Sequence, residues 1–363
     1  MPSSSSPQEA SLFQRKEVKD IRPLVLAPVE SRIVQRAIHD ALLTVPTILS
    51  YAENPHSFGG VKKRDGNSAA VPAAISAVLS AIGNGGKYII RSDISSFFTR
   101  IPKPVVTKIV ANAVQDRDFI QLFSQAIAVE LENLAELRDQ ASAFPIHEIG
   151  VAQGNSLSPL LGNLLLFEFD QEMNQGDCRC IRYIDDFIII AATQKIAEIY
   201  FVRAQNLLKK HGMEISQRKT IRQDVVRGFE FLGIELVNGQ IRPSKESRKK
   251  LINNISRELE DSRKAFQRQR HQNPIGRSLS LIETLFTVRG IVQGWGNAYF
   301  FCNESQVFSN LDGQLDSLLR QYLGAYKAAI KTGNQKERRA LLGMPLLEEF
   351  LSSPFHWPDG NKI

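Results

Sequence analysis

Two adjacent acids, Asp185 and Asp186, lie between two apolar runs in the segment Ile-Arg-Tyr-Ile-Asp-Asp-Phe-Ile-Ile-Ile at residues 181–190. The runs are rich in β-branched residues, so they predict two buried strands of a hairpin with the acids at its turn. Two carboxylates beside a hydrophobic floor cannot both stay ionised without a cation or a basic partner. Oxygen ligands of this kind suit Mg²⁺. An ordinary Asp-Asp turn is the alternative interpretation, because acids are common at turns.

A third acid, Asp93, ends a short apolar strand predicted within residues 87–102. Phosphoryl transfer with two metal ions needs acids from separate strands around ions roughly 4 Å apart, so that one ion activates the attacking oxygen and the other supports the leaving group. Only a folded sheet can bring Asp93 to the Asp-Asp pair. The sequence therefore predicts that the three acids meet in one folded sheet.

Three motifs, which follow one another along the chain as residues 93–98, 152–163 and 183–186, resemble those of the reverse transcriptases. Residues 93–98 (Asp-Ile-Ser-Ser-Phe-Phe) look like the strand end of the group II intron and retron-like branch, and residues 183–186 match the Tyr-x-Asp-Asp box. Residues 152–163 are similar to the Pro-Gln-Gly-x-x-x-Ser-Pro-x-x-x-Asn box, with Ala152 in place of proline. Their order and spacing together carry the resemblance.

The resemblance implies a catalytic centre with two Mg²⁺ ions, for which Mn²⁺ could substitute. The implied ligands are the side chains of Asp93, Asp185 and Asp186 and the backbone carbonyl of Ile94. Lys219 lies in a segment, 211–220, that looks like the family's Gly-hydrophobic-x-hydrophobic-x-x-x-Lys-Thr element. It is then the candidate general acid that protonates the departing pyrophosphate, although a surface position is the commoner fate of a lysine.

The same resemblance assigns nucleotide and nucleic-acid contacts. Arg22 is the candidate triphosphate clamp, because a guanidinium makes paired bonds to phosphate oxygens, and Arg32 is a second candidate. A solvated basic face is the alternative for both. Gln153 and Gly154 are expected to line the template and nucleotide pocket, with glycine permitting close backbone approach. Contacts to nucleic acid are expected from Tyr183, Ser158 and Asn163.

The paired aromatics Phe97 and Phe98 follow the first catalytic acid. In the family, one aromatic at this place lies under the sugar and would collide with a ribose 2′-hydroxyl. We assign Phe97 as this gate and Phe98 as a core residue. The assignment implies that deoxynucleotides are the substrates, because a bulky phenyl excludes the extra hydroxyl.

The resemblance implies an α+β right-hand polymerase with fingers, a palm built on an antiparallel sheet with helices, and a helical thumb. The expected parts are a flexible leader at 1–17, fingers with palm entry at 18–90, a palm at 91–243, and the thumb and C-terminal region at 244–363. The palm includes a helical insertion at 103–148 and a primer grip at 228–236, centred on Phe231, Leu232 and Gly233. Residues 159–175 predict one long apolar helix that supports the hairpin.

Basic residues accumulate after residue 243, as expected of a thumb that holds duplex product, although a solvated face or a protein-binding surface would look the same. Residues 288–300 are similar to the Arg-Gly-Trp-x-Asn-Tyr signature of the maturase thumb. Trp295 and Tyr299 are four residues apart on a predicted helix, so Trp295 can either stack on nucleic acid or pack in the core.

Composition agrees with a nucleic-acid enzyme. The 363-residue chain has a net charge of +7, which favours a polyanionic partner, and three cysteines, which are too few for a zinc site or a disulfide scaffold. No apolar run is long enough to span a membrane, so a cytoplasmic protein without membrane contact is expected.

The function that follows is that of a reverse transcriptase, an RNA-directed DNA polymerase. Expected partners are an RNA template or a dedicated noncoding RNA, the DNA product, deoxynucleoside triphosphates, and a partner protein or a second copy of the chain. A stand-alone bacterial enzyme of antiphage defence is the expected setting. A catalytically silent RNA-binding scaffold for a partner polymerase and an intron-splicing maturase are the alternatives.

Overall fold

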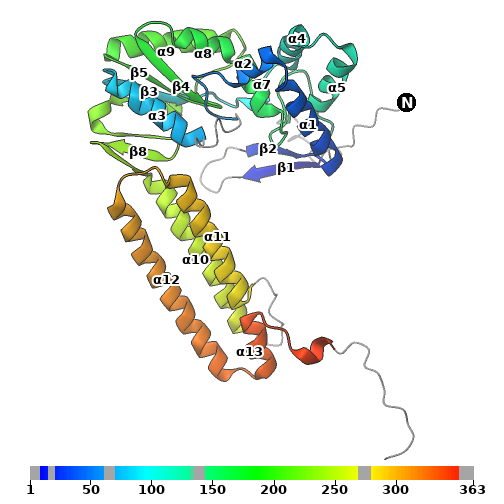
Figure 1. Ribbon diagram of the computed structural model, residues 1–363, viewed down its shortest axis with the longest axis vertical. Coiled ribbons are helices and arrows are strands. Elements are labelled where there is room, and N and C mark those ends of the chain that lie inside the picture. Colours follow the sequence, from blue (N-terminus) through cyan, green and yellow to red (C-terminus); the bar gives the residue numbers. More distant parts are fainter. Residues whose placement is uncertain are drawn as a thin grey trace, which may run out of the picture. The chain divides into compact units, whose positions relative to one another are not determined.

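The computed structural model describes residues 9–14, 21–60, 70–131, 133, 144–268 and 279–350. The chain divides into a first unit, Met1–Leu232, and a second unit, Gly233–Ile363, whose helices and strands are labelled in Figure 1. The first unit combines antiparallel strands with helices and the second is mainly helical, so the predicted α+β class is confirmed. The division falls inside the predicted primer grip.

The apolar runs form a four-stranded antiparallel sheet in the first unit. Its order is β4 (Cys178–Tyr183), β5 (Asp186–Ala191), β3 (Tyr88–Asp93) and β6 (Ile221–Asp224). Consecutive side chains of a strand point to opposite faces of the sheet. Five consecutive residues of β5 are nevertheless buried, so both faces of this strand must be covered.

Helices provide that cover. α8 (Phe167–Met173) and α9 (Gln194–Lys209) pack on one face, where Phe187 and Ile189 of β5 join their core. α3 (Ala70–Gly83) lies against β4 and β5 on the other face (Figure 1). The sequence sets where α9 begins, because the Thr193 side chain accepts a hydrogen bond from the Ile196 N–H at its first turn.

The other elements of the first unit are mostly short. They are β1 (Glu9–Gln14), β2 (Ile21–Leu26), α1 (Val29–Leu42), α2 (Pro46–Ala52), η1 (Phe98–Arg100), α4 (Lys103–Ala113), α5 (Arg117–Ile127), α7 (Ser158–Leu165), η3 (Gln217–Lys219), η4 (Val225–Arg227) and β7 (Phe229–Phe231). β1 and β2 pair as an antiparallel hairpin. α4 and α5 lie in the segment 103–148, whose place as an insertion in a palm stays a prediction.

The single long helix expected over residues 159–175 is two helices, so that prediction is wrong in this respect. α7 and α8 meet at Leu166, whose φ of −96° and ψ of 9° depart from α-helical values. The break has a packing reason, because α7 contacts α2 and α4 whereas α8 contacts β4 and α9. A straight helix could not follow both surfaces.

The second unit begins with a hairpin of β8 (Ile234–Val237) and β9 (Gln240–Pro243). Its two-residue turn is Asn238-Gly239, with φ values of 50° and 78°, a backbone that Asn-Gly adopts readily. The helices that follow are α10 (Lys245–Arg268), α11 (Leu281–Tyr299), α12 (Ser305–Thr332), α13 (Gln335–Leu342) and η7 (Leu347–Phe350). This agrees with the helical character predicted from residue 244 onward.

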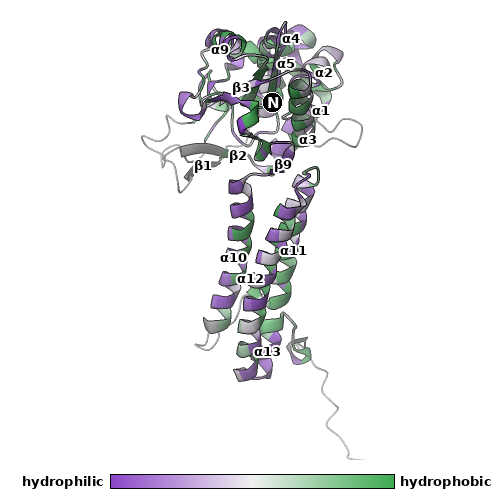
Figure 2. Cartoon of the chain, turned by 90° about the vertical axis from the view of Figure 1, so that its left-hand side faces the viewer, coloured by the Kyte–Doolittle hydropathy of each residue, from purple (hydrophilic) through white to green (hydrophobic). Residues whose placement is uncertain are grey.

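The helices of the second unit share one hydrophobic core. Leu251 and Ile255 of α10 pack with Val288 of α11 and Leu311 of α12 in that core. Figure 2 shows hydrophilic and hydrophobic residues alternating along these helices, as amphipathic helices require. None of the described helices of either unit combines the length and the apolar character of a membrane span.

Candidate active site

The three predicted acids come together at one end of the first unit's sheet. Asp93, the last residue of β3, is the register partner of Asp186, the first residue of β5. Asp185 lies in the turn between β4 and β5, and its backbone carbonyl accepts a hydrogen bond of 3.0 Å from the Ile94 N–H. The sheet therefore brings the three acids together, as predicted, and it does so through the antiparallel pairing of β3 with β5.

The turn that carries Asp185 is tight and strained. Tyr183 pairs with Asp186, so the loop contains only Ile184 and Asp185. Ile184 has a φ of 60°, and a β-branched residue in the left-handed region costs on the order of 1–3 kcal/mol. Surrounding contacts must hold this backbone in place. One of them is Gly59, where an added Cβ would lie 2.7 Å from the Ile184 backbone nitrogen.

Asp93 is the most enclosed of the three acids, with 5% of its surface exposed. One carboxylate oxygen, Oδ2, accepts a hydrogen bond of 2.5 Å from the Lys219 ammonium. The other oxygen, Oδ1, is buried and has no hydrogen-bond partner among the described residues. Buried carboxylate oxygens normally have a donor or a cation, so this atom fits the role of a metal ligand.

Asp186 is affected by the same crowding of charge. Desolvation, followed by the charges of Asp185 and Asp93, raises the pKa of Asp186 to about 6, against a smaller lowering by Arg91 and Lys219. A cation placed among the three carboxylates would offset this repulsion. Among the described residues, no three His, Cys, Asp or Glu side chains are grouped as a ready metal site in this structure, so metal binding by the three acids stays a prediction.

Lys219 reaches Asp93 because the segment before it is fastened to β3. The Ser216 N–H donates to the Asp93 carbonyl at 2.9 Å, and Ile215 forms a bridge with Ile94. The Thr220 hydroxyl lies 2.7 Å from the Ser92 hydroxyl. The structure thus brings Lys219 to the acids, while its predicted role as general acid stays a prediction.

The Gln153-Gly154 segment lies beside the strand that carries Arg22. The Val25 N–H of β2 donates to the Gln153 carbonyl at 3.0 Å. Gly154 has a φ of 113°, and an added Cβ would meet the Val25 carbonyl oxygen at 2.9 Å, so glycine is needed here for close approach. The backbone of Arg22 is in β2, opposite Phe13, but its side chain lies outside the described residues. Arg32 is exposed on α1.

Ser158 and Asn163 are buried and bond within the protein, so the structure does not support the nucleic-acid contact expected of them, which stays a prediction. Ser158 is buried and its hydroxyl donates to the Ala152 carbonyl at 2.7 Å. Asn163 is buried and its amide donates to the Gly59 carbonyl at 3.0 Å. Both residues instead shape the loops beside the acids. Tyr183 is half-buried, and burial raises the pKa of its hydroxyl.

The burial of the two aromatics contradicts the assignment of Phe97 as gate and Phe98 as core residue. Phe97 is 2% exposed and belongs to the hydrophobic core, with its ring against Gly162, where an added Cβ would lie 2.7 Å away. Phe98 is only partly buried. The 3₁₀ turn η1 begins at Phe98, which gives the two adjacent side chains different surroundings. Phe98 is therefore the accessible one.

The predicted primer grip straddles the division between the two units. Phe231 is buried, and Leu232 and Gly233 both have positive φ values, 51° and 75°. In the second unit, Trp295 packs between Tyr299 and Phe308, with ring centroids 4.6 Å and 5.8 Å away. It is part of the helical core. Of the two predicted alternatives, the structure shows core packing for Trp295, and its contact with nucleic acid stays a prediction.

Sequence reasoning missed Arg182 and its partner Asp170. Arg182 is fully buried in β4 and forms an ion pair of 2.6 Å with Asp170 of α8. A charged residue between Ile181 and Tyr183 in an apolar strand was a usable signal, because a buried charge needs a buried partner. The partner could not be chosen from the sequence, since several acids precede the strand.

Comparison with known proteins places this geometry in a family. The sequence profile described as "Reverse transcriptase (RNA-dependent DNA polymerase)" matches residues 14–236, a range that contains all three acids and Lys219. Protein YkfC of Escherichia coli (strain K12) is 26% identical over 259 residues, which cover 61% of this chain and 65% of that protein.

Two solved structures are similar at 12% identity. Apo telomerase from Candida tropicalis, truncated from the C-terminal domain, has a TM-score of 0.47 over 66% of this chain and 56% of its own. Telomerase from Candida albicans in complex with a fragment of telomeric RNA has a TM-score of 0.46 over 94% of this chain and 61% of its own. The chain thus spans less than two thirds of the length of these relatives. Because the profile match covers more than half of its residues, the chain belongs to the reverse transcriptase (RNA-dependent DNA polymerase) family.

Proposed function

We propose that this chain is an RNA-directed DNA polymerase that adds deoxynucleotides to a 3′-hydroxyl. The observation that carries the proposal is the convergence of Asp93, Asp185 and Asp186, with one buried Asp93 oxygen that lacks a partner among the described residues. A buried carboxylate oxygen without a donor is costly unless a cation binds there. A scaffold without catalysis would not need this arrangement.

The side chains of Asp93 and Asp185, helped by Asp186 and the Ile94 carbonyl, would hold two Mg²⁺ ions, with Mn²⁺ as a substitute. When bound, these ions activate the attacking oxygen and stabilise the leaving pyrophosphate. Lys219 is half exposed, and its ammonium already lies at Asp93. It would donate its Nζ proton to the departing pyrophosphate, and a flexible lysine stem allows that movement.

The nucleotide would bind where β2 meets the Gln153-Gly154 segment. Support comes from the hydrogen bond between the Val25 N–H and the Gln153 carbonyl, which brings the strand of Arg22 beside Gly154. Gly154 is exposed there, so a nucleotide could approach its backbone closely. Arg22 and Arg32 would neutralise the triphosphate.

Metal binding should be measurable without any reaction. We expect Mn²⁺ to raise the melting temperature of the wild-type protein, because a ligand at 100 times its dissociation constant stabilises the folded state by about 2.7 kcal/mol. The Asp93→Asn variant should show little of this shift. Asp177→Asn, the same change at an exposed loop position, should keep it. An equal shift in wild type and Asp93→Asn would show that the ion binds elsewhere.

Phe98 rather than Phe97 is now the proposed sugar gate, on the basis of its accessibility. We expect Phe98→Val to incorporate ribonucleotides more readily, by about 10-fold or more relative to deoxynucleotides, because the smaller side chain leaves room for the 2′-hydroxyl. Phe97→Val should instead lower stability by about 1–3 kcal/mol and leave sugar selection unchanged. Competition between labelled nucleotides checks the first and chemical denaturation the second. If Phe97→Val, and not Phe98→Val, changed the choice between ribonucleotides and deoxynucleotides, Phe97 would be the sugar gate, as first assigned.

We further propose that the polymerase works in antiphage defence with a dedicated noncoding RNA, and that a partner protein or a second copy of the chain takes part. The support is the resemblance of the motifs to stand-alone bacterial enzymes, together with the net charge of +7. Sequencing of RNA that copurifies with the protein, and plaque counts with and without the Asp185 carboxylate, test this proposal. Random cellular RNA and equal plaque counts would contradict it.

A further inference from the structure

A buried ion pair lies directly beneath the catalytic turn. Arg182 and Asp170 have exposed side-chain fractions of 0% and 1%. The guanidinium donates from Nε to Asp170 Oδ1 at 2.8 Å and from Nη2 to Oδ2 at 2.6 Å. Such a pair adds little net stability over apolar residues, because both ions lose their hydration. Its presence in a core therefore calls for another explanation.

The third guanidinium nitrogen of Arg182 provides an explanation for the buried pair. Arg182 Nη1 donates to the Ile184 carbonyl at 2.8 Å. Ile184 is the residue with positive φ, and its carbonyl belongs to the peptide unit that leads into Asp185. Asp170 thus fixes the guanidinium plane, and the guanidinium fixes the peptide before a catalytic acid. A planar group with donors on three nitrogens can make both contacts, whereas an ammonium cannot reproduce this geometry.

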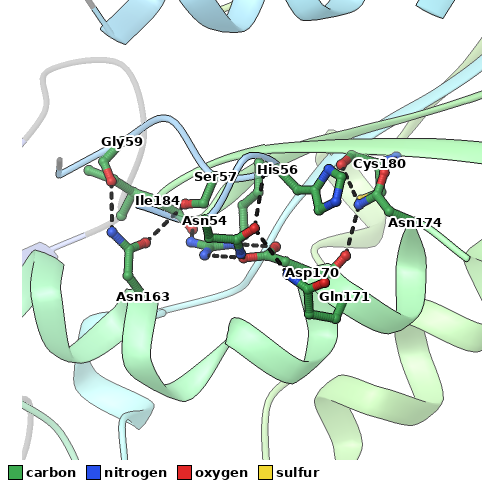
Figure 3. A network of polar contacts seen from close by, with 11 residues as sticks. Asn54, His56, Ser57, Gly59, Asn163, Asp170, Gln171, Asn174, Cys180 and Ile184 are labelled. Carbon is green, nitrogen blue, oxygen red and sulfur yellow. Dashed lines mark hydrogen bonds and ion pairs between the residues drawn. The ribbon is translucent and has the colours of Figure 1, made fainter. Parts of the chain in front are cut away.

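Further buried hydrogen bonds connect Asp170 and Arg182 to the segment that ends at Gly59, which contacts the Ile184-Asp185 turn. Asn54 donates to Asp170 Oδ2 at 2.8 Å, and the segment that follows Asn54 runs along β4, with the Arg182 N–H donating to the His56 carbonyl at 2.9 Å. Asn163 then accepts from the Ser57 hydroxyl and donates to the Gly59 carbonyl, both at 3.0 Å. Figure 3 shows these side chains joined in one continuous network between the helices and the strand.

The helix that carries Asp170 is also fastened to β4 at a second point. Asn174, the residue that ends α8, accepts from the Cys180 N–H and donates to the Cys180 carbonyl, both at 2.9 Å (Figure 3). Cys180 is two residues before Arg182, so α8 and β4 are held in one register. Because the helix breaks at Leu166, α8 can follow β4 while α7 packs on other helices. The position of the Ile184 carbonyl therefore depends on α8.

We propose that Arg182 and Asp170 are positioning residues for the reaction: they set the backbone of the Ile184-Asp185 turn so that the Asp185 carboxylate can bind metal. This inference rests on the proposed function for its activity readout but not for its metal readout. Neither residue reaches the substrate, because both are buried. A role in stability alone is the competing explanation.

A variant that removes both charges together separates the two explanations. Arg182→Met with Asp170→Asn leaves no unpaired buried charge, and the new amide oxygen can still accept the Asn54 hydrogen bond. Replacement of a whole buried pair is often neutral for stability, so this double variant is expected to fold. Arg179→Met, the same change at an exposed position of β4, is the matched control. Arg182→Lys, which keeps the charge, is the second variant if the double variant does not fold.

The readouts are kcat and KM for deoxynucleotides, the Mn²⁺ dissociation constant, and the melting temperature. We expect the double variant to bind Mn²⁺ about 10–100-fold more weakly and to lose about 100-fold in kcat, with KM nearly unchanged. Arg182→Lys should show the same direction, and Arg179→Met should behave as wild type. A folded double variant with wild-type Mn²⁺ affinity and kcat would overturn the inference. If the wild type itself makes no DNA, the proposed function fails, and the Mn²⁺ affinities alone still decide the inference.

Discussion

Replacing Asp185 with Asn is expected to remove nearly all DNA synthesis, by a factor on the order of 10³ or more. The change keeps the size of the side chain and removes one charge from a site where three acids converge. The fold should not suffer, because the amide relieves the repulsion that raises the pKa of Asp186. The rate of deoxynucleotide incorporation with saturating Mg²⁺, measured with the melting temperature of the same sample, checks both statements.

Asp177→Asn is the control for this experiment. Asp177 is exposed in the loop just before β4, so the same chemical change is made close in sequence and outside the acid cluster. It should synthesise DNA at the wild-type rate. If Asp185→Asn also kept that rate, the metal assignment would be wrong, whatever the family membership of the chain.

Gly59→Ala should lower kcat by about 100-fold, the loss expected when a reacting group moves by about 1 Å. The new Cβ would lie 2.5 Å from Ile184 Cγ1 and 2.7 Å from the Ile184 nitrogen. A side-chain atom can rotate away, but a backbone nitrogen in a two-residue turn cannot. The catalytic turn must therefore shift, although Gly59 is neither an acid nor a substrate contact.

Gly83→Ala is the matched control for Gly59→Ala. An added Cβ at Gly83, the last residue of α3, meets nothing within 4 Å, and alanine favours a helix more than glycine does. This variant should keep full activity and equal or higher stability. Wild-type kcat in Gly59→Ala would contradict the view that the turn geometry is held from the Gly59 side.

The grouping of the three acids could be predicted from the sequence because their signal is local. Asp185 and Asp186 interrupt an apolar strand pattern, and Asp93 ends another, so residue type and strand ends were enough to place them in one site. Lys219 followed from the neighbouring motif. The pairing of β3 with β5 was then the simplest arrangement that brings separate acids together, and the register confirms it.

Other features depend on which neighbours surround a residue, and residue type does not report that. Phe97 and Phe98 are chemically identical, and only the space beside Gly162 makes the first one the core residue. Ser158 and Asn163 carry polar groups that look suited to nucleic acid, yet their hydrogen bonds go to the protein backbone. The break at Leu166 likewise results from two different packing surfaces.

Arg182 shows a third limit on what the sequence alone can predict. Its position in an apolar strand is a signal that a buried partner exists, but the partner, Asp170, lies on a helix whose course depends on the break at Leu166. Only the folded structure shows that the same guanidinium also reaches the Ile184 carbonyl.

The central claim is that this chain copies RNA into DNA at the three-acid site. The most direct test is to give the purified protein, together with any RNA it carries, a defined RNA template with a DNA primer, Mg²⁺ and the four deoxynucleotides, and to sequence the product. We expect DNA complementary to the template from the wild-type protein, and none from Asp185→Asn. Tight RNA binding with no DNA product in either Mg²⁺ or Mn²⁺ would contradict it and favour a scaffold.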